Sequence, residues 1–208
     1  MKTILFQGDS ITDCGRNKDY PASLGEGYST LVASHFSYNN PGAYRFLNRG
    51  VSGNKITDLY ARRDADIFKL KPDYMSILIG INDVWHEFAD NPTQVYTKRF
   101  ELFYKMLLKE TLQELPNIKI VLLEPFTLPC STTLALGYDL FSTQVKAMAQ
   151  SVEKIANEFK LPLIKLQEDF LIASKTLGEE YWTQDGIHPT LAGHTLIANK
   201  VIDTFKNI

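Results

Sequence analysis

The sequence predicts an α/β protein in which a five-stranded parallel sheet lies between two layers of helices. Short runs rich in apolar and β-branched residues recur along the chain, and segments with helical spacing separate them. No repeat, low-complexity tract or linker interrupts this alternation. Strands that alternate with helices form right-handed βαβ units with parallel strands. We therefore expect a single domain over residues 1–208, with the flavodoxin-like strand order 2-1-3-4-5.

The five expected strands are short runs that are apolar over much of their length. Such runs are typical of strands that are covered on both faces. They lie at residues 3–6, 44–47, 74–79, 118–123 and 161–166.

Three longer segments are predicted to be helices. In residues 91–115, Asn91 is an expected N-cap, Pro92 takes the first helical position and Gln94 takes the capping-box position. A one-sided apolar stripe follows in the same segment. Residues 138–159 predict a second helix, which ends before Pro162, and residues 189–206 predict a third, with Pro189 near its start.

The composition is that of an ordinary globular protein, with 44% hydrophobic and 22% charged residues. A formal net charge of −2 argues against a dedicated nucleic-acid-binding protein. Lys55, Arg62 and Arg63 form only a short basic cluster, which is interpreted as a solvated helix face.

The amino-terminal residues MKTILFQGD do not form a signal peptide, because the apolar run is too short to be an h-region. No apolar segment has the length of a membrane span. The two cysteines, Cys14 and Cys130, form neither a CxxC pair nor a disulfide framework. A cytoplasmic location without a membrane partner is therefore expected.

Polar residues follow the ends of several expected strands. Ser10 lies in FQGDSITDCG, just past the first strand, and the segments NRGVSGN, GINDVW and DGIHPT lie in other loops. In open α/β sheets, ligands bind in the crevice outside the carboxyl ends of the strands. We expect these four loops to meet at that edge.

A serine becomes a good nucleophile when a base takes its proton and a third group holds that base. Of the four histidines, only His188 has an acidic residue three positions away in a glycine-containing loop, namely Asp185. This spacing is compatible with a Ser10–His188–Asp185 triad. An alternative is that Asp185 and His188 only cap the last helix.

Acyl transfer also requires donors for an oxyanion. The backbone N–H of Gly53 and the side-chain amide of Asn82 are candidates. Taken singly, Gly53 could equally be a turn glycine and Asn82 an Asx-turn residue.

Taken in order, the GDSIT, GVSGN, GIND and DGIHP segments resemble the SGNH hydrolases, the GDSL-type esterase superfamily. The resemblance covers the whole chain. It implies that Ser10 is the nucleophile, His188 the general base and Asp185 the residue that orients His188. It also implies an oxyanion hole made by the N–H groups of Ser10 and Gly53 and by the Asn82 amide. The GxSxG elbow of α/β-hydrolases is absent.

The longer strings FQGDSITDCGR, RGVSGNKITDLYARR and SILIGINDVWHEF are similar to intracellular bacterial acetylesterases, which include acetylxylan esterases. This resemblance implies hydrolysis of short acyl esters, with acetyl groups on small carbohydrates such as xylo-oligosaccharides as the expected substrates. Ile81 replaces a glycine that the lipase and thioesterase branch often has. Interpreted as a loop residue, it would stiffen the loop and favour a small acyl group.

Further candidates for substrate contact are Trp85, Ile81 and Tyr28, with His86 and Glu26 as neighbours in the same segments. Trp85 could offer a flat face to a sugar ring, or it could be packed in the core. No cofactor or metal is expected. A small-molecule ester is the expected partner, and a homo-oligomer is left open.

Three other functions are compatible with parts of the sequence. A metal-dependent hydrolase could use Asp185, His188 and His194, but their spacing fits no familiar zinc signature. A lysophospholipase- or thioesterase-type member of the superfamily would act on longer acyl chains. A flavodoxin-like binding domain would share the fold without catalysis.

Overall fold

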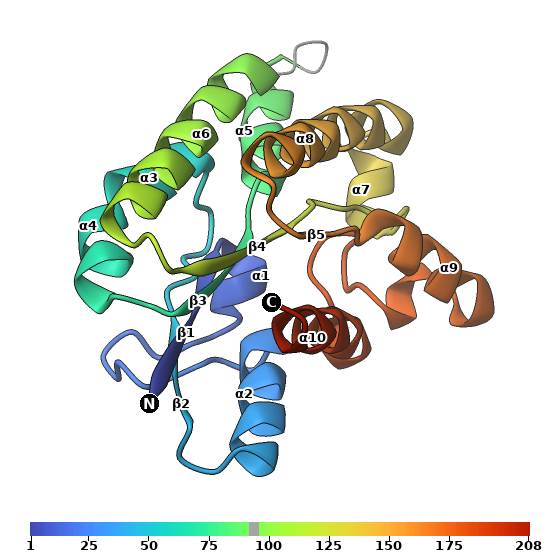
Figure 1. Ribbon diagram of the computed structural model, residues 1–208. Coiled ribbons are helices and arrows are strands. Elements are labelled where there is room, and N and C mark those ends of the chain that lie inside the picture. The colour runs from blue at the N-terminus through green and yellow to red at the C-terminus, as the bar shows by residue number, and fades with distance from the viewer. Residues whose placement is uncertain (92–95) are drawn as a thin grey trace.

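The structure is a computed structural model and describes residues 1–91 and 96–208. Five parallel strands form one sheet in the order β2-β1-β3-β4-β5, so the predicted fold class and strand order are confirmed (Figure 1). The strands are β1 (Lys2–Gly8), β2 (Tyr44–Asn48), β3 (Tyr74–Leu78), β4 (Lys119–Leu123) and β5 (Leu163–Ile164).

All five strands begin and end within two residues of the predicted runs. The largest difference is in β5, which has two residues where six were expected. It pairs with β4 through Leu122 and Leu123 only. Its flank explains the short length, because Pro162 has no N–H to give to a ladder and the chain enters a helix at Gln167.

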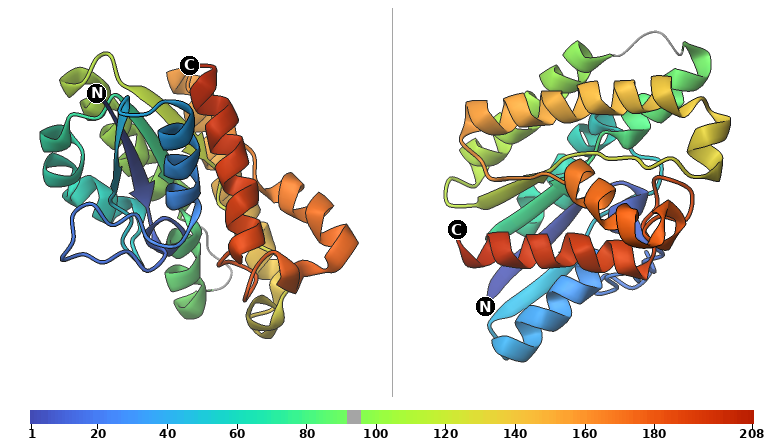
Figure 2. Two further views of the ribbon diagram at one scale, coloured as in Figure 1. Left: turned by 90° about the horizontal axis from the view of Figure 1, so that it is seen from below. Right: turned by 90° about the vertical axis from the view of Figure 1, so that its right-hand side faces the viewer.

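Helices cover both faces of the sheet (Figures 1 and 2). Helix α2 packs against α10 on one face, and α6 packs against α3 and α8 on the other. These five helices are α2 (Tyr28–Asn39), α3 (Ile56–Ala61), α6 (Thr97–Glu114), α8 (Tyr138–Phe159) and α10 (Leu191–Lys206). The remaining helical segments are α1 (Ser10–Asp13), α4 (Arg63–Asp66), η1 (Phe68–Leu70), α5 (Ile81–Asp90), α7 (Ser131–Ala135), α9 (Gln167–Leu177) and η2 (Glu179–Tyr181).

The predicted helix at residues 138–159 has the same bounds as α8. The last helix begins at Leu191, because Thr190 is its N-cap and accepts a hydrogen bond from Gly193 N–H. Helix α6 begins at Thr97, so the expectation that Asn91 caps it is wrong. Asn91 instead follows the end of α5. The positions predicted for Pro92 and Gln94 lie outside the described residues.

The sheet is buried between the helix layers. Leu5 and Phe6 of β1 and Val121 and Leu122 of β4 are fully inaccessible to solvent. Because the sheet is packed on both faces, the carboxyl ends of its strands are held in place. The loops that follow these strands are therefore held at the same edge. Within the described part of the chain, no helix has both the length and the apolar character needed to cross a bilayer.

Candidate active site

Ser10 lies immediately beyond β1, at the first position of the short helix α1. Asp9 caps this helix, since its side chain accepts a hydrogen bond from Ile11 N–H at 3.1 Å. The turn requires a glycine before it. A Cβ atom on Gly8 would lie 2.3 Å from the Leu78 carbonyl oxygen. The sequence Gly-Asp-Ser thus turns the chain sharply and leaves Ser10 at the carboxyl edge of the sheet.

His188 and Asp185 lie beside Ser10, although 178 positions separate Ser10 from His188 in the sequence. Ser10 Oγ lies 2.9 Å from His188 Nε2, and His188 Nδ1 lies 2.7 Å from Asp185 Oδ2. A carboxylate can only accept a hydrogen bond, so Nδ1 carries the proton and Nε2 is free to accept from the Ser10 hydroxyl. The three groups form one continuous hydrogen-bonded line.

The turn that carries Asp185 and His188 is held by the same carboxylate. Asp185 Oδ1 accepts from the backbone N–H groups of Ile187 at 3.0 Å and His188 at 2.8 Å. The alternative that these residues only cap the last helix does not describe the structure, because Thr190 takes the N-cap position. Asp185 therefore orients the imidazole in two ways: one carboxylate oxygen holds the backbone of His188, and the other accepts from its ring.

The titration properties of this pair follow from its contacts. Burial acts to raise the pKa of Asp185, but the hydrogen bonds from His188 and the positive charge of its ring outweigh burial and lower the pKa to about 2. The hydrogen bond and charge of Asp185 raise the pKa of His188 above the ordinary histidine value, against the effect of burial. Asp185 is thus ionised at neutral pH and stabilises a protonated His188.

The loop at residues 51–54 is tied to the same edge of the sheet. Val51 N–H donates to the Gly8 carbonyl at 3.1 Å, and Ser52 donates to Asp13 from both its N–H and its hydroxyl. Gly53 is exposed and has a φ of +82°, a conformation that favours glycine. In the described part of the chain, the N–H groups of Gly53 and Ser10 have no acceptor within the protein. Both are therefore free to donate to a bound group.

Asn82 lies in the first turn of α5, at the carboxyl end of β3. The GIND segment, expected as a loop, is therefore the start of a helix. The Asn82 amide nitrogen donates to the Asn54 carbonyl at 3.1 Å. An amide nitrogen carries two hydrogens, so one remains for another acceptor. The contact joins the residue 51–54 loop to α5 and holds the Asn82 amide in place.

Arg62 was not identified as a site residue from the sequence, and the interpretation of its cluster as a solvated helix face is wrong for this side chain. Its Nε donates to Asn54 Oδ1 at 2.9 Å, and its Nη1 pairs with Asp66 at 2.7 Å. It also reaches the carbonyl oxygens of Arg49 and Gly8. Arg62 therefore clamps the loop that positions Asn54 and Asn82, a role that no local spacing could reveal.

A cavity of about 270 Å³ opens beside the Ser10–His188 pair. Its walls include Glu26 and Gln184, which are polar, together with Cys14. Glu26 was expected near the cleft and lies there, whereas Gln184 was not singled out, although it directly precedes Asp185. The cavity lies on the His188 side of Ser10.

Two residues expected to contact substrate are instead buried in the core. Tyr28 is fully buried, and its hydroxyl forms a hydrogen bond with Thr12 at 3.0 Å. Ile81 is 2% exposed and begins α5, so it is not a loop residue. Neither side chain offers surface to a ligand, so both expectations are corrected. Residue type alone did not reveal this burial.

Trp85 is half-buried and lies three positions after Asn82 on α5, which places both on one face of the helix. Its ring meets Phe141 edge-on, with 5.8 Å between the ring centroids. This packing fixes the ring beside the candidate oxyanion residue. Contact of Trp85 with substrate stays a prediction.

His194 connects α10 to the segment around Ser10. Its Nδ1 accepts from Tyr28 N–H at 3.2 Å, and its Nε2 lies 3.2 Å from Cys14 Sγ. Burial lowers the pKa of His194 to about 4, so the ring is neutral at pH 7. His194 is therefore held in a separate set of contacts from those of His188. Among the described residues, no three His, Cys, Asp or Glu side chains converge as metal ligands would.

Two buried carboxyl groups lie close to these loops. Burial raises the pKa of Asp9 to about 7, and burial together with the nearby Asp9 raises the pKa of Asp83 to about 7. The Asp83 carboxylate accepts from Ile56 N–H, whereas Asp9 Oδ2 has no partner among the described residues. The segment preceding Ser10 thus carries a buried acid with one unsatisfied oxygen.

A parallel α/β sheet with a hydrogen-bonded Ser, His and Asp at its carboxyl edge is the arrangement of a serine hydrolase. The chain belongs to the GDSL-like lipase/acylhydrolase family, whose model matches residues 6–196. It is 35% identical over 205 residues to the acetylxylan esterase of Geobacillus stearothermophilus, an alignment that covers 94% of this chain and 90% of that one.

Solved structures show the same likeness. A crystal structure of the Geobacillus stearothermophilus acetylxylan esterase superposes with a TM-score of 0.84 at 33% identity, covering 97% of this chain and 93% of the other. An α/β hydrolase enzyme from the metagenome of Lake Arreo, Spain, gives a TM-score of 0.86 at 30% identity, with coverage of 99% and 95%. The protein is therefore a carboxylic ester hydrolase that acts on small-molecule esters.

Proposed function

We propose that this protein, as a single domain spanning residues 1–208, removes acetyl groups from small carbohydrates such as xylo-oligosaccharides through a Ser-His-Asp acyl-enzyme mechanism. The observation that carries the mechanism is the line of hydrogen bonds from Ser10 through His188 to Asp185. A cytoplasmic location stays a prediction.

In the proposed mechanism, Ser10 Oγ attacks the ester carbonyl carbon while His188 Nε2 takes the hydroxyl proton. The carbonyl oxygen becomes an oxyanion that accepts from the N–H groups of Ser10 and Gly53 and from the Asn82 amide. When the carbon–oxygen bond to the alcohol breaks, protonated His188 gives its proton to the leaving oxygen. Water activated by His188 then hydrolyses the acyl-Ser10 ester and restores the enzyme.

This sequence of proton transfers assigns the two sides of the site. The alcohol leaves toward the group that protonates it, so the cavity beside His188 is assigned to the alcohol half of the ester. Glu26 and Gln184 in its wall can exchange hydrogen bonds with hydroxyl groups. A volume of about 270 Å³ is small for a ligand pocket and suits a single sugar ring better than a large lipid.

The assignment of an acetyl group draws on the relatives named above, one of which is an acetylxylan esterase. The argument from a stiff loop at Ile81 does not contribute, since Ile81 is a buried helical residue. A lysophospholipase- or thioesterase-type activity on longer acyl chains is the competing candidate, because the matched family also includes lipases.

A panel of esters tests the proposal. We expect kcat/KM to fall from p-nitrophenyl acetate through butyrate to octanoate, and we expect acetate release from a peracetylated xyloside. Burying each additional CH₂ is worth about 0.8 kcal/mol, so a site built for long chains would instead show kcat/KM rising with chain length. Such a rise, together with no acetate release from the xyloside, would overturn the substrate assignment and leave the triad unaffected.

A further inference from the structure

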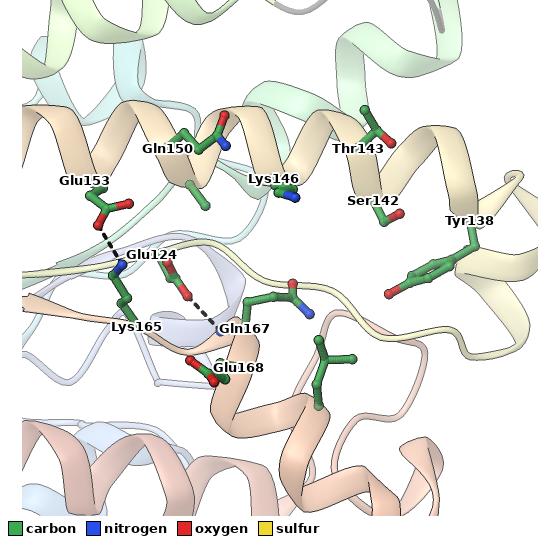
Figure 3. A pocket seen from close by; sticks show the side chains of 12 residues that line it. Glu124, Tyr138, Ser142, Thr143, Lys146, Gln150, Glu153, Lys165, Gln167 and Glu168 are labelled. Atoms are coloured by element: carbon green, nitrogen blue, oxygen red, sulfur yellow. Dashed lines mark hydrogen bonds and ion pairs between the residues drawn. The ribbon is translucent and has the colours of Figure 1, made fainter.

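A larger cavity, of about 480 Å³, lies between α8 and α9 at the carboxyl ends of β4 and β5 (Figure 3). None of its wall residues belongs to the cavity beside Ser10 and His188. Its volume lies within the range of small-molecule binding sites, and nothing in the proposed esterase mechanism uses it.

The floor of this cavity carries a nearly buried carboxyl group. Glu124 directly follows β4 and is 7% exposed. One of its oxygens, Oε1, accepts from Gln167 N–H at 2.8 Å. A carboxylate can accept about four hydrogen bonds, so this contact leaves acceptor capacity facing the cavity. Burial raises the pKa of Glu124 above its ordinary value, and hydrogen bonds from the backbone of Gln167 and Leu166 oppose that effect. A ligand with hydroxyl donors would add further partners to this carboxyl group.

Most of the wall surface is apolar, and uncharged side chains that can exchange hydrogen bonds are set into it. Figure 3 shows Gln150, Ser142 and Thr143 projecting from α8, with Gln167 opposite. The Tyr138 ring closes one end of the cavity, and the Lys165–Glu153 ion pair, at 2.6 Å, closes the other. Amide groups, a fixed carboxylate and an aromatic face are suited to a ligand with hydroxyl groups around an apolar ring.

The formal charges of the lining disfavour a strongly anionic ligand. Three carboxylates and two amines line the cavity, and one amine, on Lys165, is already paired. With Glu124 at the floor, a phosphate or sulfate group would face a buried negative charge. A neutral ligand fits this balance.

The wall is held in its binding shape before any ligand arrives. The Gln167 side chain forms two hydrogen bonds with Thr127, accepting from its N–H at 3.0 Å and donating to its carbonyl at 2.9 Å. The Tyr138 hydroxyl donates to the same carbonyl at 3.2 Å. Because these side chains are already ordered, binding would cost little conformational entropy.

We propose that this cavity is a second carbohydrate site, which binds one or two neutral pyranose units without cleaving them. The unacetylated sugar would bind through its hydroxyl groups to Glu124 and the amides of Gln150 and Gln167, with a ring face against Tyr138. The site is separate from the catalytic cavity, so its occupation does not depend on the proposed esterase function.

The test is a titration of the Ser10→Ala protein with xylobiose, followed by ¹H–¹⁵N NMR. We expect shift changes in α8 and α9. Glu124→Gln keeps an acceptor but removes the charge, so we expect binding about tenfold weaker. Ser142→Trp fills the cavity and should abolish these changes. The matched controls are Glu158→Gln and Asn157→Trp, two exposed residues of α8 outside the cavity, which should bind as the parent does.

Two outcomes would overturn the proposal. One is a titration in which the α8 and α9 signals do not move, or move equally in all four variants. The other is tighter binding of glucosamine or glucose 6-phosphate than of xylobiose, which would assign a charged ligand. When Ser10 is intact, the Ser142→Trp protein should still hydrolyse p-nitrophenyl acetate. A failed esterase assignment and a failed second site therefore give different results.

Discussion

Replacing Asp9 with asparagine should change the stability of the protein in a way that depends on pH. Asp9 is 1% exposed, and its Oδ2 has no partner in the described part of the chain. Asparagine has nearly the same shape and keeps an oxygen for the N-cap bond to Ile11 N–H. The substitution therefore removes a buried charge at high pH while leaving the turn before Ser10 intact.

The size of the effect follows from the pKa. Burial raises the pKa of Asp9 from 3.8 to about 7. A group with a raised folded-state pKa contributes its full stability below the unfolded pKa, and that contribution is lost as pH rises through about 7. The difference corresponds to about 4 kcal/mol between pH 4 and pH 8. Against this, the amide has two N–H donors where the protonated acid has one O–H, and the additional unsatisfied donor costs about 1–3 kcal/mol relative to the protonated wild type.

We therefore expect Asp9→Asn to be less stable than the wild type at pH 4 and more stable at pH 8. The assay is urea unfolding at a series of pH values, with the midpoint compared at constant m-value. Asp203→Asn, on the exposed surface of α10, is the matched control and should follow the wild type. A difference between Asp9→Asn and wild type that stays constant from pH 4 to pH 8 would refute the reasoning.

Two further predictions concern the proposed catalytic groups. Asn82→Ala should lower kcat by about 10²–10³ with little change in KM, since its amide donates to the oxyanion, and steady-state kinetics in which only KM rises would contradict this. Activity should be lost as pH falls through the pKa of His188, which lies above the ordinary 6.5, because only the neutral ring can act as base. Asp185→Asn should move that acid limb of the kcat/KM profile to lower pH and reduce kcat by about 10⁴, as in the serine-protease example. An unmoved limb would show that another group titrates.

Much of the sheet could be predicted because strands covered on both faces are apolar over most of their length. The runs at β1, β3 and β4 carry that signal, whereas β2 has the exposed Arg45 in its middle. Helix α8 was predicted to the residue, because the extended stretch before Pro162 marks its end, and in the structure Lys160 ends it in a left-handed conformation. In contrast, α5 was missed. Its start follows the strand directly at Gly80, which leaves no polar capping residue to mark it.

Site residues could be predicted where the residue type and its spacing are unusual for that part of the fold. They could not be predicted where burial determines whether a side chain reaches the site. The sequence alone shows a serine after a strand, Ser10, and an aspartate three residues before a histidine, Asp185 and His188. This pattern predicts their chemistry. Tyr28 is indistinguishable by type from a cleft tyrosine, yet it is fully buried against Thr12. The contact between Arg62 and Asn54 depends on tertiary packing, so no spacing in the sequence could reveal it.

The most direct test of the proposed mechanism is covalent labelling by a serine-reactive p-nitrophenyl phosphonate, followed by peptide mass spectrometry. We predict one adduct, on Ser10, that forms in proportion to the loss of esterase activity. Ser10→Ala should be unlabelled, inactive and as stable to urea as the wild type. An adduct on another residue, or a Ser10→Ala protein that keeps a tenth of the wild-type turnover, would contradict the assignment of Ser10 as the nucleophile.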